Sequence, residues 1–287
     1  MCWMCDATND LTSELLWTKR GWRRTIKSHE TYLLELRAKG LPIPALFLIV
    51  TLRLEGVALD CLHVADQGIS SHIIANALVE IMGLGHWGST QHEQAQNLQA
   101  DIQRWYKTKP LVSRIQGRLS YERLKTSGDW PKLKAKGAAT RHLAAYAAEI
   151  TNKYNHGSVH DKQRHAICHL LNRFYEIIAE QTRQLSNEAK AEMRTISEYL
   201  VSIYISLADE ALSKGVRMWK MTAKCHAFQH LLETQACTLI NPAYSWNYSS
   251  EDLQRVMKDI ALSCHKNNMS FMVVYKWLTD AFDECGD

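Results

Sequence analysis

Apolar residues recur at helical spacing through the second half of the chain. From residue 161 onward, positions three, four and seven residues apart are apolar in one segment after another, as in amphipathic helices. The pattern predicts helices at about 161–180, 187–214, 218–237, 250–264 and 271–282. Helices this closely spaced can bury their apolar faces only against one another, so a helical bundle is predicted here.

The first half alternates between helical and irregular patterns. A short apolar segment at 46–54 is compatible with a buried strand or a helix, and further helices are expected at about 71–82, 91–108, 111–124 and 132–150. A polar break follows at 152–160. The sequence therefore predicts a mainly α fold with at most two or three strands, all before residue 70. Three parts are expected: 1–88, a basic helical segment at 89–151, and a helical bundle at 152–287.

Composition narrows the class of protein. The chain has 287 residues, of which 46% are hydrophobic and 22% charged, with only 5 prolines and 13 glycines. These values are those of a globular protein and exclude low-complexity classes. The longest uncharged apolar run, 41–52, is shorter than the roughly 20 residues that a membrane span needs. We expect no membrane partner and no signal peptide, and hence a reducing intracellular setting for the eight cysteines.

Positive charge is concentrated in two segments. The net charge of the chain is only +4, but 17–39 holds seven Lys and Arg against two Glu, and 104–141 holds eleven against two acidic residues. Tryptophan and tyrosine are interleaved with these cations, as in surfaces that bind nucleic acid. Solvated helix faces are the alternative reading. The residues expected to contact DNA are Arg20, Arg23, Arg24, Arg104, Lys107, Lys109, Arg114, Arg118, Arg123, Lys132, Lys134 and Lys136.

One short block combines carboxylates with an imidazole. Asp60, His63 and Asp66 lie within seven residues of one another, just after an apolar run. Carboxylate oxygens at such a position can hold a divalent cation such as Mg²⁺ or Mn²⁺, although similar clusters commonly cap a turn.

The cysteines and histidines give weaker patterns. Cys2 and Cys5 have the spacing of a zinc knuckle, but no second C-x-x-C completes the four ligands that zinc needs. We therefore expect a frayed terminus there and no zinc site. His226 and His230 are one helical turn apart and could share a metal, but satisfied polar residues are the more common explanation of such a pair.

Several blocks together resemble eukaryotic DDE transposases of the CACTA type and their Kyakuja-Dileera-Zisupton relatives. The block from Leu59 to Ile69 is similar to a D-x-x-H motif of that family, and Lys132–Lys136 resembles its leucine-lysine helix. The segment around His226 and His230 resembles its K-x-H-x-x-x-H motif, and the upstream C-x-x-C has a counterpart in related reading frames. The loop that leads to Glu251 resembles the one before the family's acidic helix.

The resemblance implies an RNase H-like core, interrupted by a helical insertion, in which two Asp and one Glu hold divalent metals for DNA strand transfer. Asp60 and Glu251 would be catalytic residues, and Asp60, His63 and Asp66 would be metal ligands. A first catalytic Asp on an early strand is missing. We therefore expect at most a remnant of the RNase H-like core before residue 70, no cleavage activity, and Mg²⁺ or Mn²⁺ only if the chain is active.

Three functions remain open from the sequence. The first is a transposase-derived, nuclear, DNA-binding fragment that can form homo-oligomers and does no chemistry. The second is an active metal-dependent transposase or nuclease. The third is a helical interaction scaffold without a nucleic-acid partner.

Overall fold

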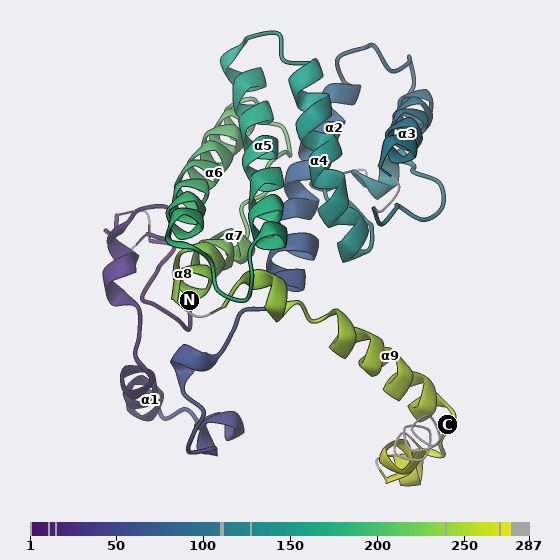
Figure 1. Ribbon diagram of the computed structural model, residues 1–287. Coiled ribbons are helices and arrows are strands. Elements are labelled where there is room, and N and C mark those ends of the chain that lie inside the picture. The colour runs from purple at the N-terminus through teal and green to yellow at the C-terminus, as the bar shows by residue number, and fades with distance from the viewer. Residues whose placement is uncertain are drawn as a thin grey trace. The chain divides into compact units, whose positions relative to one another are not determined.

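The computed structural model describes residues 2–276 except 11, 15, 110, 111, 127, 239 and 270, and it describes no side chains for 249–252. Nine α-helices lie in this part of the chain (Figure 1). They are α1 His29–Ala38, α2 Ser70–Met82, α3 Gln91–Thr108, α4 Gly137–Lys153, α5 Val159–Glu180, α6 Asn187–Ser213, α7 Ala223–His230, α8 Ala236–Thr238 and α9 Tyr248–Leu262.

Helix α2 lies at the centre of the core. It is preceded by a π-helical segment, Leu62–Ile69, and eleven of its thirteen residues are buried. It packs against α4 and α5, while α5 also packs against α6 and the π-helical segment packs against α7. Because α2 is buried on nearly all sides, its residues Ile73, Ile74 and Ala75 can all be apolar although they point in different directions.

The long helices begin where the sequence provides capping side chains. Thr90 and Glu93 form a reciprocal capping box at the start of α3, with the Thr90 hydroxyl accepting from the Glu93 N–H. Ser158 and Ser186 accept in the same way at the starts of α5 and α6. Serine or threonine side chains thus fix where three of the four longest helices begin.

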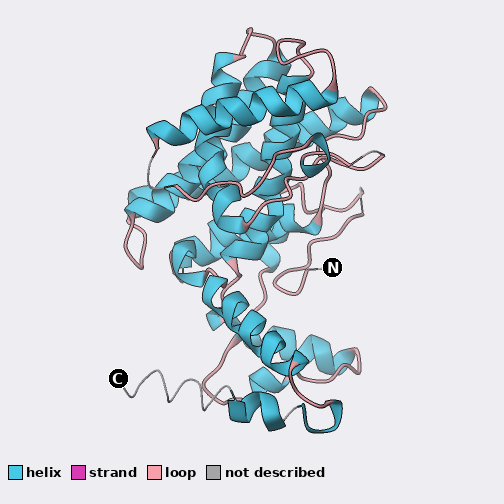
Figure 2. Ribbon diagram, turned by 90° about the vertical axis from the view of Figure 1, so that its right-hand side faces the viewer, coloured by secondary structure: helices cyan, strands magenta, loops and turns pink. Residues whose placement is uncertain are grey.

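The mainly α prediction is confirmed, and the remnant of an RNase H-like core is not seen. Among the described residues, the only β pairing is an isolated bridge between Thr8 and Leu16, and Figure 2 shows helices joined by loops. The apolar segment at 46–54 forms only short 3-10 turns, one of them Ala45–Leu48, and Val50 is 96% exposed. A strand needs a second strand to which its backbone can hydrogen-bond, and this segment pairs with no strand among the described residues.

The helix expected at 111–124 is wrong, and the helix expected at 132–150 is present only from Gly137 onward, as α4. Residues 112–126 are irregular apart from a 3-10 turn at Tyr121–Arg123, and 132–136 are non-helical with a bend at Ala135, so α4 starts only at Gly137. Glycines at 117 and 128 adopt positive φ values that interrupt a helix.

The chain forms two compact units, Met1–Ser245 and Trp246–Asp287. The second contains α9, and residues 271–276 are helical as predicted; the rest of the helix expected at 271–282 lies outside the described residues. None of the described helices is long and apolar enough to cross a membrane.

Candidate metal centre and basic groove

Cys2 and Cys5 lie in a tight N-terminal turn whose backbone points at their sulfur atoms. The N–H of Met4 donates to Cys2 Sγ at 3.4 Å, and the N–H of Ala7 donates to Cys5 Sγ at 3.4 Å. Cys5 is fully buried. Backbone N–H groups aimed at sulfur stabilise a thiolate, which is the form that binds metal.

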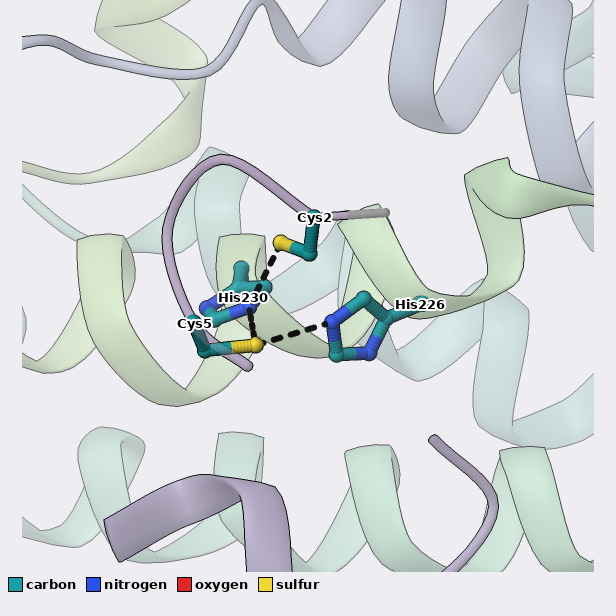
Figure 3. Close-up of side chains that lie close together, drawn as sticks. All are labelled: Cys2, Cys5, His226 and His230. Carbon is teal, nitrogen blue, oxygen red and sulfur yellow. Dashed lines mark hydrogen bonds between the residues drawn. The ribbon is translucent and has the colours of Figure 1, made fainter. Parts of the chain in front are cut away.

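The two histidines come from one face of α7. With 3.6 residues per turn, His226 and His230 project side by side, and Figure 3 shows both rings facing the cysteines. His226 Nδ1 lies 3.1 Å from Gln229 Oε1, and His230 Nδ1 lies 3.4 Å from Thr234 Oγ1. A proton held on Nδ1 by these partners leaves Nε2 with its lone pair directed at the sulfurs.

The four ligand atoms have the spacing of a tetrahedral S₂N₂ site. Cys5 Sγ lies 3.3 Å from Nε2 of His226 and 3.3 Å from Nε2 of His230, and Cys2 Sγ lies 3.5 Å from Nε2 of His230. All four atoms lie within 4.8 Å of one another. Zn–S bonds of about 2.3 Å and Zn–N bonds of about 2.0 Å place sulfur and nitrogen roughly 3.5 Å apart at a tetrahedral angle. The group could therefore hold a metal such as zinc.

The two thiols do not have equal acidities. The contact with the Cys5 thiol lowers the pKa of Cys2, burial opposes this, and the neighbouring His226 and His230 lower the pKa further. The same contact with Cys2, together with burial, raises the pKa of Cys5. A divalent cation that binds both sulfurs would require both thiols to be deprotonated.

Side chains around the centre hold the N-terminal segment against the bundle. The indole of Trp22 is fully buried and packs edge-on against His226 at 4.6 Å between ring centroids, and against His230 at 4.7 Å. The Arg23 guanidinium, next in sequence, donates two hydrogen bonds to the Glu233 carboxylate, one of them 2.7 Å long. The cluster is thus part of a packed and hydrogen-bonded interface.

The expectation of a frayed N-terminus was wrong. Each half of the site was visible in the sequence as C-x-x-C and H-x-x-x-H, but 221 residues separate Cys5 from His226. No local pattern links two half-sites that far apart. The site could have been predicted by combining the two pairs, because each supplies only two of the four ligands that zinc needs.

The structure places the acidic candidates in different surroundings. Asp60 caps the helical segment that begins at Cys61: its Oδ1 accepts from the Leu62 N–H at 2.9 Å, and its Oδ2 contacts His63 Nδ1. Asp66 is fully buried and accepts a 2.7 Å hydrogen bond from the Tyr175 hydroxyl. Within the described residues, the sole group of three or more potential ligands is the Cys2His2 set, so Asp60, His63 and Asp66 do not form one.

Glu251 lies on α9, in the second compact unit, and its side chain is outside the description, so its catalytic role stays a prediction.

The cations expected to contact DNA fall into three sets. In the first set, each cation has a carboxylate partner: Arg20 with Glu198, Arg23 with Glu233, Arg104 with Asp101 and Lys109 with Glu149. The second set surrounds a concave groove of about 720 Å³. Its cations are Arg114, Arg123, Lys132, Lys134 and Lys136.

The remaining cations of the prediction lie elsewhere. Arg24 and Lys107 are exposed, and the Arg118 guanidinium lies 3.0 Å from His92 Nε2.

Comparisons with known proteins leave the family open. No protein-family model, no curated protein and no solved structure matches the chain.

Proposed function

We propose that the chain binds one structural Zn²⁺ ion through Cys2, Cys5, His226 and His230. The observation that carries this proposal is the convergence of two sulfur and two nitrogen atoms within 4.8 Å. Four protein ligands fill a tetrahedral zinc site, which leaves no position for a substrate or an activated water. The ion would be structural rather than catalytic.

The proposed ion would connect the N-terminal segment to α7. Because the unfolded chain cannot present four ligands from opposite ends in one place, the free energy of binding would contribute to folding. The Arg23 pair with Glu233 and the Trp22 contacts would then act on a segment that is already anchored.

Metal analysis of the purified chain tests this proposal. We expect about one zinc per chain, lost in Cys5→Ser and in His230→Ala. Cys264→Ser and His169→Ala are matched controls, because both residues lie outside the cluster. Cobalt gives a second readout that needs no variant: a tetrahedral S₂N₂ site gives d–d bands and a thiolate-to-cobalt charge-transfer band. If the parent chain takes up neither metal with this signature, the proposal is wrong.

We also propose DNA as the macromolecular partner, because the cations of the groove share one concave surface. Phosphate groups are the common ligand of such surfaces, and binding through them weakens steeply with salt. The sequence resemblance to DDE transposases supports the same partner and a nuclear location. A relation to such transposases, without their catalytic step, is part of this proposal. Failure to bind DNA at low salt would favour the interaction-scaffold alternative.

A further inference from the structure

Residues 132–134 are held along the groove by backbone hydrogen bonds, and a bend follows at Ala135. The Leu133 N–H donates to Ser71 O at 2.9 Å, at the start of α2. The N–H groups of Lys132 and Lys134 donate at 2.8 Å to the carbonyls of Leu124 and Arg123. Three consecutive backbone groups are thus tied to the core and to the neighbouring loop, which fixes the direction of every side chain between them.

The side chains of this segment differ in exposure. Leu133 is 2% exposed and faces the core, whereas Lys132, Lys134 and Lys136 are exposed. All three lysines line the groove, so they lie on the same side of the segment. We call Lys132, Lys134 and Lys136 the lysine strip.

Arg123 organises the groove and is not itself available to a ligand. Its guanidinium donates to the carbonyls of Lys134, Gln116 and Arg118 at distances between 2.7 and 3.1 Å. These bonds use the guanidinium to join the two walls of the groove. Arg123 is therefore a positioning residue. The lysines keep N–H groups for a ligand: Lys134 Nζ donates one hydrogen bond, to Thr126 Oγ1 at 2.7 Å, and an ammonium group has three donors.

The charge of the strip is not neutralised by ion pairs. No ion pair among the described residues includes Lys132, Lys134 or Lys136, in contrast to the neighbouring Arg104 and Lys109. Burial, and then the positive charge of Lys132, lower the pKa of Lys224 nearby. The positive charges of Lys132 and Lys224 thus repel each other, and binding of a polyanion would relieve this repulsion.

We propose that the lysine strip binds the phosphodiester backbone of one nucleic-acid strand, with successive lysines contacting successive phosphates. This inference rests on the proposed DNA binding and assigns it to these three residues. The described lining of the groove consists of aliphatic, amide and cationic side chains, with no aromatic ring on which a base could stack. The contact would therefore be independent of sequence.

Fluorescence anisotropy with two labelled 20-mers of mixed sequence, one single-stranded and one duplex, tests the strip in the full chain. The test variant is K132Q/K134Q/K136Q, and the matched control K153Q/K162Q/K190Q removes three lysines from α4, α5 and α6. We expect the test variant to bind at least about tenfold more weakly at low salt, and the control to stay within about twofold of the parent. K132R/K134R/K136R should restore binding, because it restores the charge.

The salt dependence distinguishes the two forms of nucleic acid. Removing three phosphate contacts should lower the slope of log K against log salt by about 2.1 for a single strand and about 2.7 for a duplex. A parent chain that binds neither probe at low salt refutes the proposed DNA binding itself. A parent that binds, with a test variant as tight as the control, overturns the lysine strip alone. A circular dichroism melt checks that each variant is folded. If the glutamine variant is unfolded, the binding of the arginine variant is compared with that of the parent instead.

Discussion

His226 Nε2 lies 3.3 Å from Cys5 Sγ, although 221 residues separate the two in the sequence. The contact joins the first turn of the chain to a helix near the end of the first compact unit. Anything that loosens the N-terminal segment should therefore also weaken the affinity of the proposed centre for metal.

Trp22 provides the sharpest test of that link. Its ring packs against both imidazoles without contributing a ligand atom. We expect Trp22→Ala to lower zinc affinity by about 10- to 100-fold, as is usual when the groups that orient metal ligands are removed. Trp22→Phe should lose less, because a ring remains. Competition with a chromophoric chelator measures the affinity, and an unchanged value in Trp22→Ala would contradict the orienting role; Trp130→Ala is the control.

Arg23 should contribute to folding stability rather than to DNA binding. Its guanidinium is 24% exposed and its partner Glu233 is 13% exposed. A double-mutant cycle with Arg23→Ala and Glu233→Ala should give a coupling of about 1–2 kcal/mol in the free energy of unfolding, measured by urea titration. DNA affinity should change less than twofold, as in the exposed neighbour Arg24→Ala. If Arg23→Ala loses much of its DNA binding while Arg24→Ala does not, Arg23 contacts DNA and this prediction is wrong.

The helices could be predicted from the sequence because their determinants are local. The capping box at Thr90 and Glu93 and the apolar spacing through α5 and α6 act within a few residues, and the structure has these elements. The helix predicted at 132–150 starts five residues late. Lys132–Lys136 has high helix propensity, yet its backbone is tied to Ser71 and Arg123. Tertiary hydrogen bonds decided its conformation.

The candidate site was hidden for a related reason. A C-x-x-C turn and an H-x-x-x-H helix each have an ordinary structural explanation, and only the fold brings them together. The D-x-x-H block shows the reverse case: Asp60 and His63 are close in sequence and in space, but Asp66 is buried against Tyr175. Proximity along the chain thus predicted the contact between Asp60 and His63 correctly, but it wrongly grouped Asp66 with them.

A partly buried charge network between α2, α5 and α6 makes stability depend on pH. His160 contacts Glu80 at 2.9 Å and Glu210 at 2.7 Å, while Arg164 and the Trp219 indole also face Glu80. The hydrogen bond with Glu80, followed by that with Glu210, raises the pKa of His160 from 6.5 to about 9. A raised pKa means that the folded state holds the proton more tightly than the unfolded state.

The stabilisation from His160 should therefore be complete below about pH 6.5 and lost as the pH rises through 9. We expect His160→Gln to be less stable than the parent at pH 6, with the difference between them shrinking from pH 7 to pH 9. Urea unfolding at each pH measures it, with the exposed His169→Gln as the control. A difference that stays constant, or grows, with pH would show that His160 is not protonated in the folded protein.

The last prediction concerns catalysis by the acidic candidates. Two-metal strand transfer needs carboxylates that hold two cations about 4 Å apart. Asp60 is hydrogen-bonded to the Leu62 N–H and to His63, Asp66 is buried, and no carboxylate cluster of metal-binding size occurs in the described part of the chain. The proposed zinc site has all four positions filled by protein, so it offers no open coordination position either.

We therefore expect that the chain does not nick supercoiled plasmid with Mn²⁺ or Mg²⁺, and that Asp60→Ala gives the same result. The groove should still retain the plasmid on a gel at low salt, which shows that the substrate is bound. Because zinc in the proposed centre is not exchanged by Mn²⁺ under mild conditions, Cys5→Ser separates any effect of that centre from one at Asp60. Nicking by the parent that disappears in Asp60→Ala but persists in Cys5→Ser would establish a catalytic carboxylate and replace the DNA-binding proposal with an active nuclease.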